Sequence, residues 1–145
     1  GAVIDSSATT PYTKTANAAA ERIAFDSATG EITCRRGGTT ATIVNGVADL
    51  RFEYGVGSAV DPQRISSFIK TNPTSTQPVL AVRYTTLFKS TGSRLREATS
   101  ADTALANWQS LSGATTTEFN TIKAADSGHL YQTAQNTVML RNRMP

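Results

Sequence analysis

The feature that most constrains the fold is a strict alternation of apolar and charged residues near position 50. In residues 49–54 (DLRFEY), Leu50, Phe52 and Tyr54 alternate with residues that are all charged. Successive side chains of a β-strand point to opposite faces, so this segment predicts a strand with one apolar and one charged face. The apolar face is expected to sit on a hydrophobic core.

Other segments share this period of two or are rich in β-branched residues. The longest of them, residues 77–90, has apolar side chains on both sides, which places it in the centre of its sheet. The two nearest the start of the chain flank a turn at residues 27–30, and this arrangement predicts a hairpin. The strands expected besides 49–54 are residues 21–26, 31–35, 42–44, 77–90, 131–135 and 137–141.

Two short helices are predicted between these strands. Asp61 and Pro62 form a favourable helix start, and apolar residues then recur at helical spacing, which predicts a helix over residues 62–70. Ser100 can cap a second helix over residues 101–109. Separate strands and short helices predict an α+β fold with an antiparallel sheet.

The 145 residues fit one domain, residues 1–145. Its first twenty residues hold few large apolar side chains and are expected to form a loosely ordered lead-in. No stretch of the sequence approaches the roughly 18 apolar residues of a membrane-spanning helix.

The sequence offers little to a catalytic or metal site. It has one His and one Cys, and it lacks the common nucleotide-binding, metalloprotease and serine-hydrolase motifs. Asp126, Ser127 and His129 lie close in sequence, but no pattern joins them to a pocket. We therefore expect no enzymatic activity, no cofactor, no metal and no small-molecule substrate.

Cys34 is the only cysteine, and it falls on the apolar side of the first predicted hairpin. Two interpretations are open. It packs as a small apolar residue, or it forms a disulfide with a cysteine outside this sequence, because an unpaired cysteine in a secreted domain calls for a partner.

The basic residues give a net charge of +3, which does not by itself indicate a nucleic-acid-binding protein. An Arg-x-Arg pair on a strand places both guanidinium groups on one side, where they suit phosphates or a carboxylate-rich partner. The same charges also protect a strand edge from aggregation. We expect weak or no DNA binding. The candidate DNA-binding or partner-binding residues are Lys89, Arg94, Arg96, Arg141 and Arg143.

Four segments together resemble a known family in their order and spacing. The most specific pieces are the VNGV and LRFEYG runs, the AVR of the long strand and the closing TVMLRNR. They resemble the carboxy-terminal part of PilW-like minor pilins of bacterial type IV pili. The segments are residues 21–34, 43–55, 78–90 and 136–145.

The resemblance implies a pilin-like domain whose amino-terminal transmembrane and pilus-core helix is truncated. Such proteins are made with a leader that a prepilin peptidase removes, and the helix anchors them in the inner membrane before it packs in the pilus. The sheet's apolar face is expected to pack on the carboxy-terminal half of that helix, which also offers a place for a partner of Cys34. Relatives often carry an Asp- and Gly-rich stretch where residues 55–61 offer a single carboxylate, too few oxygen ligands for calcium.

The resemblance also implies a function. We expect a non-enzymatic minor pilin that helps to initiate type IV pilus assembly, in a tip complex with other minor pilins and in contact with the major pilin. Its expected location is the inner membrane and periplasm before assembly and the extracellular pilus afterwards. The alternatives are a pilus-tip module that binds DNA or surfaces during uptake or adhesion, and a minor pseudopilin of type II secretion.

Overall fold

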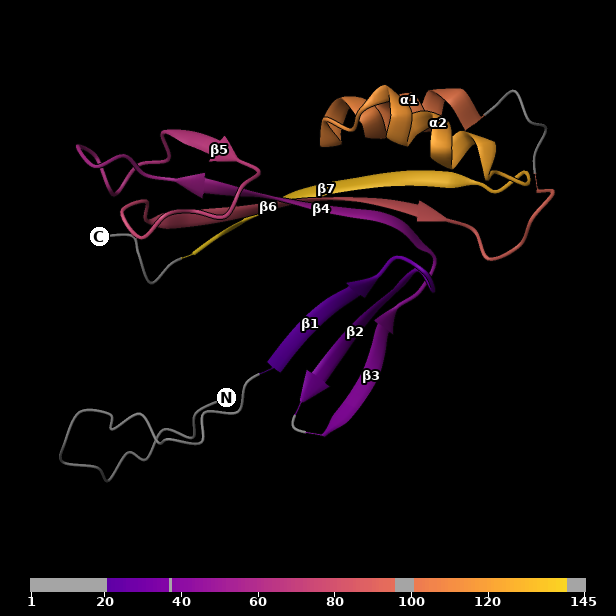
Figure 1. Ribbon diagram of the computed structural model, residues 1–145, viewed down its shortest axis with the longest axis horizontal. Helices are drawn as coiled ribbons and strands as arrows, with labels where there is room; N and C mark the ends of the chain where they lie inside the picture. Colours follow the sequence, from indigo (N-terminus) through magenta and orange to yellow (C-terminus); the bar gives the residue numbers. More distant parts are fainter. Residues whose placement is uncertain (1–20, 37, 96–100, 141–145) are drawn as a thin grey trace. The chain divides into compact units, whose positions relative to one another are not determined.

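The computed structural model describes residues 21–36, 38–95 and 101–140. Within these ranges lie seven strands and two helices (Figure 1). The chain divides into two compact units, residues 1–45 and 46–145. The single domain expected from the length stays a prediction, and the lead-in expected over residues 1–20 lies outside the described residues.

The first unit contains a three-stranded antiparallel sheet of β1 (Glu21–Asp26), β2 (Glu31–Arg36) and β3 (Thr39–Val44). The N–H of Gly30 donates to the Asp26 carbonyl at 2.9 Å, and Gly30 has a φ of 71°, which favours glycine. The predicted hairpin is confirmed, and β3 begins three residues earlier than expected.

Alternation places the large apolar side chains of β1 and β2 on one face. Cys34 pairs with Ile23 on β1 and with Ala41 on β3. Cys34 is half-buried with a free thiol, whereas 67% of Ile23 is exposed. Cys34 therefore lies on the apolar side of its sheet, as the sequence predicts.

The second unit contains a four-stranded antiparallel sheet in the order β5-β4-β6-β7. Its strands are β4 (Val47–Val56), β5 (Ser67–Ile69), β6 (Val79–Lys89) and β7 (Tyr131–Met139). The central position predicted for the longest strand is confirmed, since β6 lies between β4 and β7. The two runs expected near the end of the chain form the single strand β7.

The helix predicted over residues 62–70 is wrong, because the segment forms turns and the short strand β5. The N–H and hydroxyl of Ser66 both donate to the Val56 carbonyl, at 2.9 and 3.0 Å. β5 then pairs with the last three residues of β4. The helical spacing of its apolar residues therefore gives way to pairing with the open edge of β4, a tertiary interaction that local spacing does not report.

Both helices lie over one face of the second sheet (Figure 1). α1 (Ala101–Ser112) confirms the predicted second helix and extends it by three residues. α2 (Thr116–Ala124) was not predicted from the sequence. It begins at a capping box in which Thr115 and Glu118 satisfy each other's backbone N–H groups.

The hydrophobic core of the second unit lies between the helices and the sheet. Trp108 and Leu105 of α1 are fully buried against Leu87 of β6. The helices cover the face of β4 that carries Asp49 and Arg51, as the contacts described below establish. The apolar face of residues 49–54 was expected to sit on a core, but the helices pack on the opposite, charged face.

The face that the helices do not cover keeps large apolar side chains partly accessible. Phe52 of β4 and Val138 of β7 are 46% and 50% exposed, and they share this face with Tyr84 and Val82 of β6. Neither helix of the described residues has the length and apolar character needed to cross a membrane.

Candidate functional site

A charged cluster on β4 attaches the helices to the sheet. The Arg51 guanidinium donates to Asp49 at 2.9 Å and to Glu118 of α2 at 2.7 Å. The Trp108 indole N–H donates to the same Asp49 oxygen at 3.1 Å, and the guanidinium lies 5.4 Å from the centre of the Trp108 ring. One arginine therefore connects the sheet with both helices.

The ion pair between Arg51 and Glu118 favours the charged form of both groups. A hydrogen bond from Arg51, with further hydrogen bonds from Thr115, lowers the pKa of Glu118 from 4.5 to about 2. Burial lowers the pKa of Arg51, but hydrogen bonds to Glu118 and Asp49 outweigh it, so that the pKa of Arg51 rises overall. Across the physiological pH range, the guanidinium and the Glu118 carboxylate form a stable ion pair.

Glu118 should make the stability of the second unit depend on pH. Its pKa is lower in the folded chain, so its contribution is present above about pH 4.5 and is lost as the pH falls towards about 2. Glu118→Gln keeps a capping oxygen but removes the charge. The urea midpoint of the variant should therefore fall less than that of the wild type between these pH values.

Glu31→Gln is the matched control, because Glu31 belongs to the sheet of the first unit, where it accepts a hydrogen bond from the Thr42 hydroxyl at 3.4 Å, and its variant should keep the wild-type pH profile. Parallel urea midpoints for the wild type and Glu118→Gln over this pH range would contradict the assigned ion pair.

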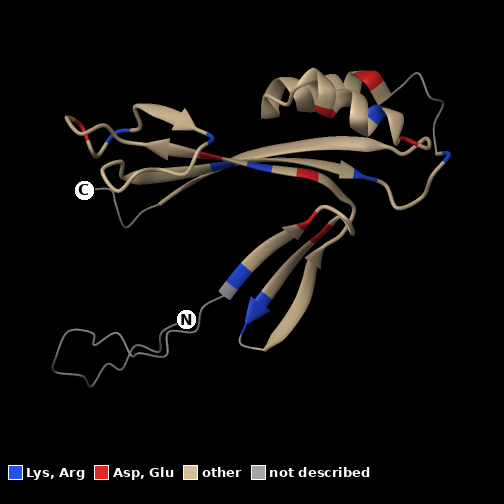
Figure 2. Ribbon diagram, in the orientation of Figure 1, with Lys and Arg blue, Asp and Glu red and all other residues tan. Residues whose placement is uncertain are grey.

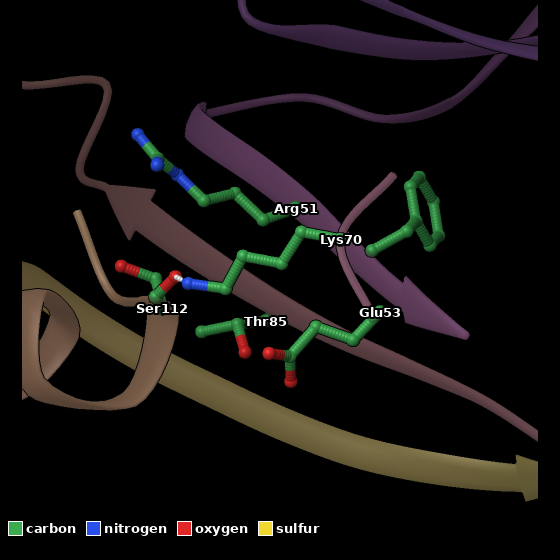
Figure 3. A pocket seen from close by; sticks show the side chains of 6 residues that line it. Arg51, Glu53, Lys70, Thr85 and Ser112 are labelled. Carbon is green, nitrogen blue, oxygen red and sulfur yellow. Dashed lines mark hydrogen bonds between the residues drawn. The ribbon is translucent and has the colours of Figure 1, made fainter. Parts of the chain in front are cut away.

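A polar cavity of about 260 Å³ lies beside Arg51 (Figure 3). The Lys70 ammonium, which follows β5, donates to the Ser112 carbonyl at the end of α1, at 3.0 Å. Gly113 follows with a φ of 63°, and a Cβ there would meet the Lys70 ammonium. The cavity is lined by Arg51, Phe52, Glu53, Lys70, Thr85 and Ser112.

The cavity is smaller than the roughly 300–1,000 Å³ of typical ligand pockets. Two of its charged side chains also form hydrogen bonds to other residues of the protein. Glu53 accepts a hydrogen bond from Arg83 at 3.4 Å, and Lys70 is held at the end of α1. No group of three or more His, Cys, Asp or Glu residues in the described part of the chain could hold a metal ion. The arrangement thus fixes the helices on the sheet.

Ser127 and His129 do lie within hydrogen-bond distance of each other. The Ser127 hydroxyl is 3.1 Å from His129 Nε2, and His129 Nδ1 lies 2.8 Å from the Ser90 carbonyl oxygen. Asp126 accepts from the backbone N–H groups of Gly128 and His129, so its carboxylate closes the turn. These contacts join the loop after β6 to the segment before β7.

The basic residues predicted as a binding group are only partly within the described chain. Lys89 is exposed at the end of β6, and Arg94 is exposed in the following loop, where its N–H donates to the Ser127 carbonyl at 2.9 Å. Figure 2 shows basic and acidic residues interspersed along the second unit. Arg96, Arg141 and Arg143 lie outside the described residues, so a joint binding surface stays a prediction.

Sequence reasoning missed the Arg51 cluster, although two signals for it exist. The charged face of residues 49–54 contains Asp49 and Arg51, and the spacing of Thr115 and Glu118 is that of a capping box. Neither signal predicts that the segment containing Arg51 contacts the segment containing Glu118.

Comparison with known proteins addresses the function. The sequence model of the family described as type IV pilus-assembly protein W matches residues 12–142, which is nearly the whole chain. The chain belongs to the PilW family. This PilW-family protein is therefore a component of type IV pilus assembly and of the cell envelope in which that assembly takes place. No curated protein and no solved structure matched the chain.

Proposed function

We propose that this PilW-family chain is the pilin-like domain of a non-enzymatic minor pilin that helps to initiate type IV pilus assembly. It acts in a tip complex with other minor pilins and contacts the major pilin. The protein resides in the inner membrane and periplasm before assembly and in the extracellular pilus afterwards.

The observation that carries this proposal is the accessible apolar face of the second sheet. The helices pack on the charged side of β4, through Arg51 and Trp108, and leave Phe52 and Val138 half exposed on the other side. Large apolar surfaces of this kind mark interaction sites. We propose that this face packs against the apolar amino-terminal helix implied by the resemblance to minor pilins.

Deletion of the gene tests the proposed role. A strain without it should carry fewer surface pili and move less by twitching, because initiation of the fibre becomes rare. Counting pili by electron microscopy and measuring twitching zones check this result, and the wild-type gene supplied in trans is the control. Normal piliation in a deletion strain that has no second copy would refute the proposal.

Direct binding of DNA is the alternative function, and Lys89 and Arg94 favour it because both are exposed in one region of the chain. If the five basic residues form a site that neutralises about four phosphates, the logarithm of the affinity should fall with that of the salt concentration at a slope near −3 to −4. Arg94→Ala should flatten this slope by about one unit.

We expect no binding tighter than micromolar at physiological salt, since the net charge is only +3. A mobility-shift titration at low and physiological salt checks the expectation, with Arg22→Ala in the first unit as a control for net charge. Submicromolar binding at physiological salt would rank DNA binding above assembly. The match to a type IV pilus family favours pilus assembly over a role in type II secretion.

A further inference from the structure

β7 leaves one long edge of the second sheet open among the described residues. It pairs with β6 through nine consecutive residue pairs without a bulge, and no strand of the described chain pairs with its other side. Residues 131–140 (YQTAQNTVML) contain no charge and no proline, and every residue from Ala134 to Met139 is exposed. Charges, prolines, bulges and short length are the usual protections of an edge strand, and β7 has none of them.

The backbone groups of β7 alternate between β6 and the outer edge. The Ser90 N–H donates to the Leu130 carbonyl, and the Leu140 N–H donates to the Leu80 carbonyl. Hydrogen-bonded pairs alternate along an antiparallel ladder, so the even-numbered residues of β7 bond to β6. Residues 133, 135, 137 and 139 therefore direct their N–H and C=O groups outwards.

The Thr137 N–H agrees with this direction. It donates to the side chain of its neighbour Asn136 at 2.7 Å and not to β6. The Asn136 side chain is exposed, so a neighbouring strand can replace it as the acceptor. The outer edge thus offers a donor and an acceptor at every second residue.

A second copy of this chain does not fit this edge. The argument rests on the proposed function, in which the apolar face packs on the amino-terminal helix. Placing β7 beside β7 either reverses the direction of one copy or turns its apolar face to the other side of the joint sheet. The two helices would then run in opposite directions or lie on opposite sides. A copy shifted sideways without rotation would bring β7 beside β5, which offers only three residues.

We propose that β7 pairs with an edge strand of a different pilin subunit in the tip complex. The partner strand runs antiparallel to β7, which is the more stable pairing. It carries uncharged side chains, because β7 offers no charge to pair with them. The partner's helix runs parallel to that of this chain and lies on the same side of the joint sheet.

The apolar face supports this occupant because it reaches the open edge. Val138 and Met139 are 50% and 44% exposed, and Val138 shares the apolar face with Val82 of β6. A subunit joined at β7 therefore extends the apolar face sideways, so that a second helix can pack beside the first. Backbone hydrogen bonds along an added strand supply affinity, and the side chains beside it supply specificity.

Photo-crosslinking in living cells tests the partner. p-Benzoylphenylalanine in place of Thr137 in the full-length protein should form an adduct with another pilin subunit, which mass spectrometry identifies. The same residue in place of Asn120 is the matched control and should form no such adduct. Both positions are exposed, and Asn120 lies on α2.

An adduct with a second copy of this chain, equal adducts from both positions, or no adduct from position 137 would overturn the proposal. This measurement does not depend on the number of pili that the cell makes. Its failure is therefore distinct from a failure of the proposed role in assembly, which the deletion strain tests.

Proline substitution tests the backbone pairing. Gln135→Pro removes an outward N–H and keeps the ladder to β6, whereas Gln135→Ala keeps that N–H. Both variants lose the hydrogen bond from the Gln135 amide to Thr85. With the photo-crosslinker at position 137, Gln135→Pro should lower the yield of the pilin adduct at least about tenfold, and Gln135→Ala should change it little.

Urea midpoints of the purified chains establish that each variant is folded. Met139→Pro and Met139→Ala repeat the comparison at the last residue of β7, where a proline disturbs folding least. Adduct yields that are equal for the folded proline and alanine variants would overturn the proposed pairing.

Discussion

Replacing Trp108 with alanine should lower the free energy of unfolding of the second unit by about 3 to 5 kcal/mol. The side chain is fully buried against Leu87 and Leu105, and its removal leaves a cavity that the neighbouring strands cannot close. The substitution also removes the indole N–H that donates to Asp49. Domains of this size are stable by only about 5 to 15 kcal/mol, so a large part of the stability would be lost.

Urea unfolding followed by circular dichroism measures this effect, since Trp108 is the only tryptophan and its fluorescence disappears with it. Leu111→Ala is the matched control on the same helix. Leu111 is 40% exposed, and its truncation should cost less than about 1 kcal/mol. A Trp108→Ala variant as stable as Leu111→Ala would show that the core is centred elsewhere.

Phe52→Asp should abolish pilus assembly while the chain itself stays folded. Phe52 is half exposed on the apolar face, so a carboxylate there remains hydrated in the isolated chain. If that face packs against an apolar helix, the same carboxylate becomes buried without a partner, a cost of several kcal/mol. Complementation of the deletion strain with this variant should restore few or no pili.

The control for this variant is Val60→Asp, in a loop where the side chain is 95% exposed. It introduces the same charge without touching the apolar face and should restore piliation fully. Urea midpoints of both variants establish that the chains are folded. Full piliation with a folded Phe52→Asp protein would contradict the proposed use of this face.

Most of the strands other than β5 were predicted well, because they carry their signal within their own residues. Residues 49–54 alternate strictly, and the first hairpin has a turn that ends in Gly30. Both patterns indicate which side of the strand is apolar. They do not indicate on which face of the sheet the helices pack. The helices pack on the charged face because of contacts between residues that are distant in the sequence.

Helices were harder to predict where tertiary pairing competes with local spacing. Residues 62–70 have the start signal and the spacing of a helix, yet hydrogen bonds to Val56 and the open edge of β4 draw residues 67–69 into a strand. α2 is the opposite case, a helix that forms although its sequence has few apolar residues at helical spacing. Its capping box is a local signal. Thr115 and Glu118 were the available signal for it.

The candidate site was likewise predictable only in its local features and not in the contacts between distant residues. The charges of Asp49 and Arg51 are visible in the sequence, but the ion pair with Glu118 joins residues 67 positions apart. No local pattern reports such a pair. Of the five basic residues proposed for binding, Lys89 and Arg94 lie in described parts of the chain, and their joint action stays a prediction.

The attachment of the helices through Arg51 also constrains how this sequence can change during evolution. A buried or half-buried charge that loses its partner is costly, so a change at Arg51 is tolerated best with a compensating change at Glu118. The accessible face around Phe52 needs only apolar character and can exchange one large side chain for another. Across related sequences, positions 51 and 118 should therefore covary as a pair, while position 52 varies independently among apolar residues.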